Sequence, residues 1–334
     1  MAQPRLTWVD LAKVISICLV TSYHTPPPLT GYTAQLIQLL RMPAFFLIAG
    51  FLFNDQRFPN LKALLIHRAR QLLVPYMTFE TLLIGLTCHD GASLREASSN
   101  ALLGHPTVCY PLWFLVCLFG MQVIHYVGLR ITQRLSHQTV LTTKTGLWLL
   151  AVYIGICTLL SPLELTQHFQ FNAVIVNLPF YAAANCCKPL VHNIEWRQYK
   201  TTAACLAGGL LLVALKYSWG EEAGGWLHGA IYYLMHLAAG LLLLPPYIAT
   251  CKAVGQAIGH QRLIEYLGSN TIVILALHTY YIIIISHLLD LTKVGMWLNP
   301  LLTVLIVLGH LPIVWAINRW MPWLLGRGRQ TGAQ

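Results

Sequence analysis

The sequence predicts an all-α, polytopic integral membrane protein with about ten transmembrane helices and both termini in the cytoplasm. Of its 334 residues, 56% are hydrophobic and only 10% are charged, whereas soluble domains have about 25% charged residues. The mean hydropathy is +0.60. The apolar residues gather in stretches long enough, or nearly so, to cross about 30 Å of hydrocarbon, and most basic residues fall in alternate gaps between them.

Ten apolar stretches are expected to form the spans. They cover residues 8–26, 33–53, 70–88, 110–129, 145–161, 171–187, 200–217, 227–250, 268–289 and 297–318. The first stretch has no A-x-A-like cleavage site after it, so we expect an uncleaved span rather than a signal peptide. We expect residues 1–334 to form one membrane domain with a short cytoplasmic tail from about 320, and no additional soluble domain.

The distribution of basic residues sets the topology. With the N-terminus inside, the outer loops hold only three of the 21 lysines and arginines, namely Arg95, Lys216 and Lys293. Because cytoplasmic loops collect Lys and Arg, this asymmetry favours ten helices with both ends inside. It also accounts for the net charge of +10 without a nucleic-acid partner. The outer loops hold six acidic residues, which are Asp90, Glu96, Glu164, Glu221, Glu222 and Asp290.

The first span carries ionisable residues in an otherwise apolar stretch, TWVDLAKVISICLVTSYH at residues 7–24. Ionisable groups in a membrane span are costly and usually functional. Lys13 and His24 are roughly 16 Å apart along a helix and share a face to within roughly 20°. Asp10 precedes Lys13 by three residues and can pair with it. The alternative is a lysine that snorkels to the headgroups and an interfacial histidine.

The second span places a guanidinium inside the membrane. Arg41 lies a turn or two below the outer surface and is followed at once by Met42 and Pro43. A charged group there needs a partner or a water-filled cavity. Because the first two spans are antiparallel across a short loop, we expect His24 and Arg41 at the same depth, in one cavity. Snorkelling of Arg41 to the outer surface is the alternative.

The third span begins with a cationic collar of His67, Arg68 and Arg70 at the cytoplasmic surface. Guanidinium groups suit phosphates through bidentate hydrogen bonds, although a positive collar is common to membrane proteins. Glu80 follows near mid-membrane, as a site residue or as a structural carboxylate paired with Lys13 or a histidine.

Three later spans add polar or aromatic groups. Trp113 is an additional site residue or part of an interfacial aromatic belt. His228, Tyr232 and His236 form a stripe at spacings of four, and His278 lies about mid-membrane, where a helix–helix hydrogen bond is the simpler role. The nine cysteines have no metal-ligand spacing, and we expect no metal site. Whether Cys88 and Cys109, which flank one outer loop, form a disulfide stays open.

These segments together resemble the acyltransferase 3 family of integral membrane acyltransferases, and its fucose 4-O-acetylase-like and surface-polysaccharide branches in particular. The carriers, in the family's order, are WVDLAKVISICLVTSYH, RMPAFFLIAGFLF, RARQLLVPY, PLWFL, NLPFYAAAN and YLGSNTIVILALH. The first fits the family's basic residue, ten intervening residues and histidine, here Lys13 and His24. Two positions depart from the family pattern. Its Arg-x-x-Arg falls on His67 and Arg70, with Arg68 as a substitute, and a late glycine of the sixth span is Ala184.

The resemblance implies transfer of an acyl group, usually acetyl, from acetyl-CoA to a sugar hydroxyl in a bacterial cytoplasmic (inner) membrane. His24 would be the general base or the acyl acceptor, and Arg41 would stabilise the oxyanion. Asp10 and Lys13 would complete the catalytic set. Lys13 would also contact the cofactor, with His67, Arg68 and Arg70 holding the CoA phosphates. The implied partners are acyl-CoA, a sugar or glycan acceptor and membrane lipids.

Other functions fit the same pattern. A transporter or flippase for a lipid-linked glycan suits ten helices, prolines within spans and intramembrane charges, although no inverted repeat stands out. A succinyl or longer-acyl transferase of the same build, and a non-catalytic assembly scaffold, are further alternatives. The acceptor, the acyl length, a covalent intermediate and the oligomeric state are not fixed by the residues.

Overall fold

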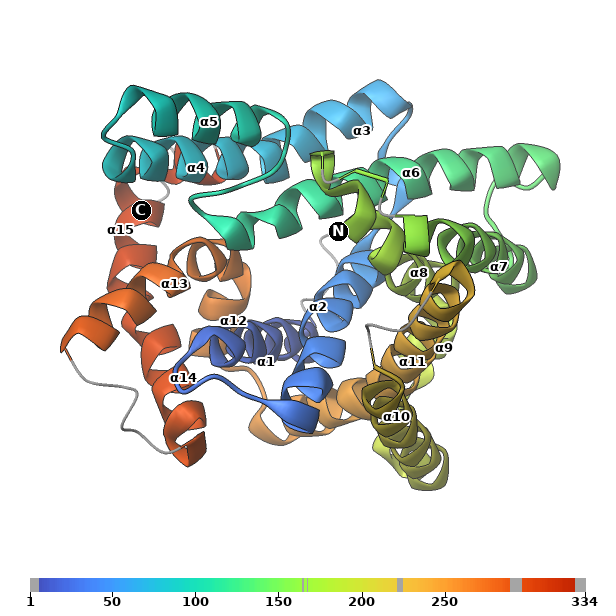
Figure 1. Ribbon diagram of the computed structural model, residues 1–334. Helices are drawn as coiled ribbons and strands as arrows, with labels where there is room; N and C mark the ends of the chain where they lie inside the picture. Colours follow the sequence, from blue (N-terminus) through green and yellow to red (C-terminus); the bar gives the residue numbers. More distant parts are fainter. Residues whose placement is uncertain (1–5, 164, 167, 221–224, 289–295, 328–334) are drawn as a thin grey trace.

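The computed structural model describes residues 6–163, 165–166, 168–220, 225–288 and 296–327 (Figure 1). Within these ranges it is all helical and has no strand. The α-helices are α1 (Thr7–His24), α2 (Gly31–Leu52), α3 (Leu61–Arg68), α4 (Val74–Thr87), α5 (Gly91–Leu102), α6 (Trp113–Leu135), α7 (Thr143–Leu160), α8 (Phe171–Cys186), α9 (Lys188–Asn193), α10 (Tyr199–Trp219), α11 (Gly225–Ile258), α12 (Arg262–Ser269), α13 (Thr271–Leu288), α14 (Asn299–Gly309) and α15 (Leu311–Trp320).

Each predicted span corresponds to helix. In the described part of the chain seven segments are long and apolar enough to cross a membrane, and these are Gly31–Leu52, Tyr110–Leu135, Thr143–Leu163, Tyr199–Trp219, Gly225–Ile258, Thr271–Leu288 and Asn299–Trp320. The other three predicted spans correspond to α1, α4 and α8, which are helical but shorter or more polar, so the total of ten stays a prediction. Part of the charge pattern lies outside the described residues, including Arg5, Glu164, Glu221, Glu222, Asp290, Lys293, Arg329 and the tail beyond residue 327.

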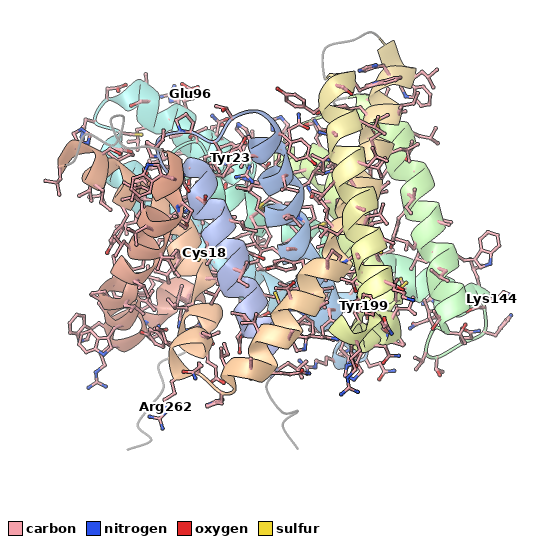
Figure 2. The ribbon with its side chains drawn as sticks, turned by 90° about the horizontal axis from the view of Figure 1, so that it is seen from below. Cys18, Tyr23, Glu96, Lys144, Tyr199 and Arg262 are labelled. Carbon is pink, nitrogen blue, oxygen red and sulfur yellow. The ribbon has the colours of Figure 1, made fainter. Side chains whose placement is uncertain are left out.

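The two ends of the bundle carry the residues that the charge pattern assigns to opposite sides of the membrane. In Figure 2, Tyr23 and Glu96 lie at one end, and Lys144, Tyr199 and Arg262 lie at the other. Cys18 of α1 lies between them. The His24 end of α1 is therefore on the side of Glu96, the predicted outer side, and the Lys13 end is toward the predicted cytoplasmic side.

Helix α1 lies near the middle of the bundle and packs against α2, α11, α12, α13 and α14 (Figure 1). Its residues Ala12 and Ile17 are fully buried. Tyr247 of α11 donates a hydrogen bond of 2.6 Å to the carbonyl of Ala12 and is 2.9 Å from the hydroxyl of Ser16. This central position explains how α1 can carry Asp10, Lys13 and His24 in a predicted span: most of its surface faces protein rather than lipid.

Prolines within the helices disturb the backbone in defined places. Pro179 in α8 has no N–H, so the carbonyl of Ile175 loses its helical donor, and the hydroxyl of Tyr233 lies 3.5 Å from that carbonyl as a replacement. Before Pro75 the helix widens into a π turn, η2 (Ala69–Leu73). Such turns often occur at functional sites, and this one directly follows Arg68.

The outward surface of α7 is apolar, as a lipid-facing helix requires. Trp148, Val152, Ile156 and Leu159 are spaced by four, four and three residues, and each is about half exposed or more. Helix α5 of the outer loop was not expected from the sequence. Asp90 could have indicated its start, because the Asp90 carboxylate accepts hydrogen bonds from the amides of Ala92 and Ser93 as an N-cap. All nine cysteines are free, Cys88 and Cys109 included.

Close packing of α2 on α8 gives a stability test. A Cβ atom at Gly50 would overlap the backbone carbonyl of Tyr181, whereas a Cβ at Gly85 would meet nothing within 4 Å. We expect Gly50→Ala to destabilise the protein by about 1–3 kcal/mol through overpacking. Gly85→Ala should be neutral or stabilising, because alanine is the better helix former. Thermal unfolding of both variants in detergent measures the difference, and equal midpoints would contradict the packing.

Candidate active site

His24 and Arg41 meet at the predicted outer end of α1. Nη1 of Arg41 is 3.4 Å from Nε2 of His24. The guanidinium also lies over the ring of Tyr23, 3.7 Å from its centroid, which is cation–π geometry. A guanidinium has donors only, so Nε2 of His24 is the accepting nitrogen. The arrangement holds a basic imidazole nitrogen beside a fixed positive charge.

Asn299, at the start of α14, fixes the end of α1 that carries His24. Its side-chain amide donates to the carbonyls of Ser22 (3.1 Å) and Thr25 (3.0 Å). Its Oδ1 accepts from the hydroxyl of Ser22 at 2.5 Å. The last carbonyls of a helix lack intrahelical donors, and here a buried amide supplies them on both sides of His24. Asn299 is 1% exposed.

His24 and Arg41 open into a cavity of about 250 Å³, the upper cavity. Neutral polar groups line it, from Gln38, Asn177 and His236, together with the aromatic side chains of Tyr110 and Trp113. Nε of Arg41 and Nε2 of His236 are buried and have no hydrogen-bond partner among the described residues. Donors and acceptors without partners at the edge of a cavity are suited to a polar ligand.

A second cavity of about 970 Å³, the lower cavity, lies toward the predicted cytoplasmic end. Four basic side chains line it, from Lys13, Arg57, Arg68 and Lys188. Lys13 pairs with Asp10 at 3.7 Å, as its spacing predicts. Lys188 donates to the carbonyl of Phe53 at the end of α2. The lower cavity therefore combines a large volume with concentrated positive charge.

Aromatic rings separate the two cavities, which have no lining residue in common. Phe45 and Phe114 line the lower cavity, and their centroids are 5.5 Å apart. Phe46 packs against Phe114 at 5.0 Å and against Trp113, a wall of the upper cavity, at 6.4 Å. The structure therefore has two cavities, one on either side of this aromatic layer, rather than one continuous passage.

Of the expected cationic collar, only Arg68 reaches the lower cavity. Its guanidinium lies near the rings of Phe53 and Phe58, at 5.7 and 5.3 Å, and Nη1 donates to Gln71. His67 and Arg70 are exposed. Desolvation and then the neighbouring guanidinium groups, that of Arg68 foremost, lower the pKa of His67. His67 thus adds little positive charge near pH 7.

Glu80 does not pair with Lys13 or with a histidine, in contrast to the structural role weighed from the sequence. It is fully buried, and its two oxygens accept hydrogen bonds from the amides of Thr107, Val108 and Cys109, at 3.0, 3.1 and 3.0 Å. These amides lead directly into η3 (Tyr110–Leu112), whose Tyr110 and Pro111 line the upper cavity. Glu80 therefore holds the loop that leads into the wall of the upper cavity.

Of the other two additional residues, Trp113 lines the upper cavity and His278 lies beside His24. The ring of His278 is 5.3 Å from that of His24, centroid to centroid. Sequence reasoning missed Gln38, Asn177 and Asn299, and it assigned Arg57 and Lys188 only to the topology. One feature of the sequence could have identified these polar residues, which is their position within or beside apolar stretches.

The fold and this arrangement define a polytopic membrane protein with a polar cavity enclosed in its helix bundle. Among the described residues no group of three or more His, Cys, Asp or Glu side chains could hold a metal ion. The acyltransferase 3 family model, an acyltransferase domain, matches residues 6–319. The chain therefore belongs to the acyltransferase 3 family and is a membrane acyltransferase. No curated protein and no solved structure matches it.

The Asn299 contacts give a test of how α1 is held. We expect Asn299→Ala to lower stability by about 1–3 kcal/mol, because the carbonyl of Thr25 loses its donor inside the bundle and that of Ser22 keeps only the 3.3 Å bond from the Thr25 amide. Thr303→Val is the matched control, since it removes only a 3.4 Å bond from the Thr303 hydroxyl to Asn299. Detergent unfolding midpoints compare the two. A larger loss of stability in Thr303→Val than in Asn299→Ala would contradict the role of Asn299 in holding the end of α1.

Proposed function

We propose that this acyltransferase moves an acetyl group from cytosolic acetyl-CoA to a hydroxyl of a sugar, in a cell-surface glycan or lipid-linked saccharide, within a bacterial cytoplasmic membrane. One observation carries the proposal. A large basic cavity and a small polar cavity lie along α1, with Lys13 at the first and His24 at the second. A donor and an acceptor entering from opposite sides of the membrane would meet near His24.

The lower cavity suits the nucleotide end of CoA. Its volume of about 970 Å³ is at the upper end of ligand sites, which span roughly 300–1,000 Å³. Arg57 and Arg68 can bind phosphate in bidentate fashion, and Lys13 and Lys188 add point charges. Arg70, which is exposed and does not line this cavity, would contribute to attraction of the anionic donor rather than to direct contact, and His67 would add little charge to it.

The pantetheine arm would pass through the aromatic layer. The span from Lys13 to His24, roughly 16 Å along the helix, is comparable to an extended pantetheine. Rotation of Phe45 and Phe114 would let the thioester through, and the same rings would keep water from the upper cavity between turnovers. The aromatic layer would then open only when the donor is bound in the lower cavity.

Transfer requires a base and an oxyanion donor, and the upper cavity holds both types of group. In direct transfer, Nε2 of His24 takes the hydroxyl proton while the acceptor oxygen bonds to the acetyl carbon. Arg41 stabilises the negative charge on the carbonyl oxygen. The carbon–sulfur bond then breaks, and the sulfur takes the proton from His24 to give CoA. If His24 instead accepts the acetyl group first, the same nitrogen is the nucleophile.

The lining of the upper cavity supports a sugar acceptor and a short acyl group. Gln38, Asn177 and His236 offer neutral polar atoms for hydroxyl groups, and Trp113 and Tyr110 offer aromatic surface. A volume of about 250 Å³ leaves little room for a long acyl chain beside a sugar. Acetyl is therefore favoured over succinyl and longer groups.

Removal of the imidazole tests the chemistry. We expect His24→Ala to lose transfer by at least about 10²-fold, since general acid–base catalysis contributes roughly 10²–10⁴-fold, while the protein still inserts. His89→Ala, an exposed histidine outside both cavities, should keep wild-type activity. Release of free CoA from labelled acetyl-CoA by membranes with acceptor measures the rate. Normal acetyl transfer by His24→Ala would overturn the assignment, and absence of CoA release by the wild type would favour a transporter.

Donor binding is tested separately. We expect Arg68→Ala and Arg57→Ala to raise the KM for acetyl-CoA several-fold with little change in kcat, because each removes a phosphate contact made alike in ground and transition states. The wild-type KM should rise with ionic strength. Lys144→Ala, exposed and outside the lower cavity, is the control. A KM unchanged in both arginine variants would exclude this cavity as the donor site.

A further inference from the structure

His278 of α13 has a protonation pattern that its backbone contacts determine. The side chain is fully buried. Its Nδ1 lies 3.1 Å from the carbonyl of Ile274 and 2.9 Å from that of Leu275. Carbonyl oxygens only accept hydrogen bonds, so Nδ1 carries the proton. Nε2 therefore has the lone pair, and in the described part of the chain it has no hydrogen-bond partner.

His24 has the complementary pattern. Because Arg41 only donates, the contact of Nη1 with Nε2 leaves the proton of neutral His24 on Nδ1. That N–H needs an acceptor. The rings of His24 and His278 are 5.3 Å apart with planes at 52°. A hydrogen bond of about 3 Å between ring nitrogens, added to the distance from each nitrogen to its centroid, gives a similar separation.

We propose that His278 is a positioning residue that accepts a hydrogen bond from Nδ1–H of His24 during acyl transfer, and this inference rests on the function proposed above. Each group in this chain then donates a hydrogen bond to the next: Arg41 to His24, His24 to His278, and His278 to the backbone of α13. The chain fixes the tautomer and the orientation of His24. Its basic Nε2 faces the upper cavity, and its Nδ1 proton is held on the far side of the ring.

The hydrogen bond matters most when His24 is positively charged. After Nε2 takes the hydroxyl proton, both ring nitrogens carry hydrogens. The Nδ1 proton stays on His24 and donates to the lone pair of His278, while the Nε2 proton goes to the CoA sulfur. His278 remains neutral throughout and its Nδ1 proton does not move. Stabilisation of the imidazolium by an uncharged acceptor strengthens the base, in the way that the third member of a catalytic triad does.

His310 provides a matched control within the same fold. Like His278 it is fully buried, its Nδ1 bonds a carbonyl four residues earlier (Ile306, 2.7 Å), and its Nε2 has no partner among the described residues. Its ring, however, stacks on Tyr281 with centroids 3.9 Å apart and makes no recorded contact with His24. A purely structural role for buried histidines predicts equal effects at the two positions.

The experiment measures acetyl transfer by His278→Phe, His278→Gln and His310→Phe in membranes. We expect His278→Phe to lower kcat roughly 10²-fold and to leave the KM for acetyl-CoA unchanged. In His278→Gln the amide oxygen can take the place of Nε2 as acceptor, so part of the rate should return. His310→Phe should keep the wild-type kcat.

The pH–rate profile supplies a readout that packing does not move. The ionisable groups around His24 are Tyr23 and Arg41 beside it, His278 from α13, and His236 and Tyr110 in the wall of the same cavity. Loss of the acceptor destabilises the imidazolium, so the acidic limb of kcat should shift to lower pH in His278→Phe and not in His310→Phe.

Several outcomes would overturn the inference. These are equal losses in His278→Phe and His310→Phe, an unmoved acidic limb, or a His278→Gln variant that folds but transfers no faster than His278→Phe. An active wild type with an equally active His278→Phe overturns this inference alone. A wild type that releases no CoA in the presence of acceptor overturns the proposed function and this inference with it.

Discussion

The structure depends on one constraint, that a polar group inside a helix bundle in lipid must find its partner within the protein. Most of the polar side chains on the inside obey it through the backbone. Glu80 accepts three amide hydrogens of the loop before η3. Asn299 supplies the donors that the end of α1 lacks. Tyr233 reaches the carbonyl that Pro179 leaves open. Each of these contacts joins two elements, so the polar residues determine where helices end and how they meet.

Several buried side-chain atoms are exceptions to that constraint, and three of them lie around His24. Nε of Arg41, Nε2 of His236 and Nε2 of His278 are buried without partners among the described residues, and all three belong to side chains in or beside the upper cavity. A native protein keeps few such atoms. Their grouping around His24 suggests that substrates or protonated intermediates complete the hydrogen bonds. Hydrogen bonds that these atoms do not make within the folded protein can then contribute to the free energy of ligand binding.

The aromatic layer divides the reaction path by chemistry. Below it, four cations and a large volume suit an anionic donor. Above it, neutral amides, imidazoles and aromatic rings suit an uncharged hydroxyl compound. The packing of Phe45, Phe46 and Phe114 separates these two environments. On the proposed path the thioester carbonyl would pass this layer, and Arg41 would stabilise the oxyanion on its upper side.

The sequence by itself determined the all-helical membrane fold, the family, and the two residues that meet at the end of α1. It could do so because hydropathy, charge asymmetry and short loops are local: His24 and Arg41 are 17 residues apart on adjacent helices. It could not reveal Asn299, which is 277 residues from Ser22, or separate Arg68 from Arg70 as the group that enters the cavity. It left the role of Glu80 open and gave no indication of the three loop amides that bind its carboxylate. Those outcomes depend on which helix faces pack together and on the π turn after Arg68, and only the assembled bundle decides them, because burial and hydrogen-bond partners are properties of contacts between distant segments.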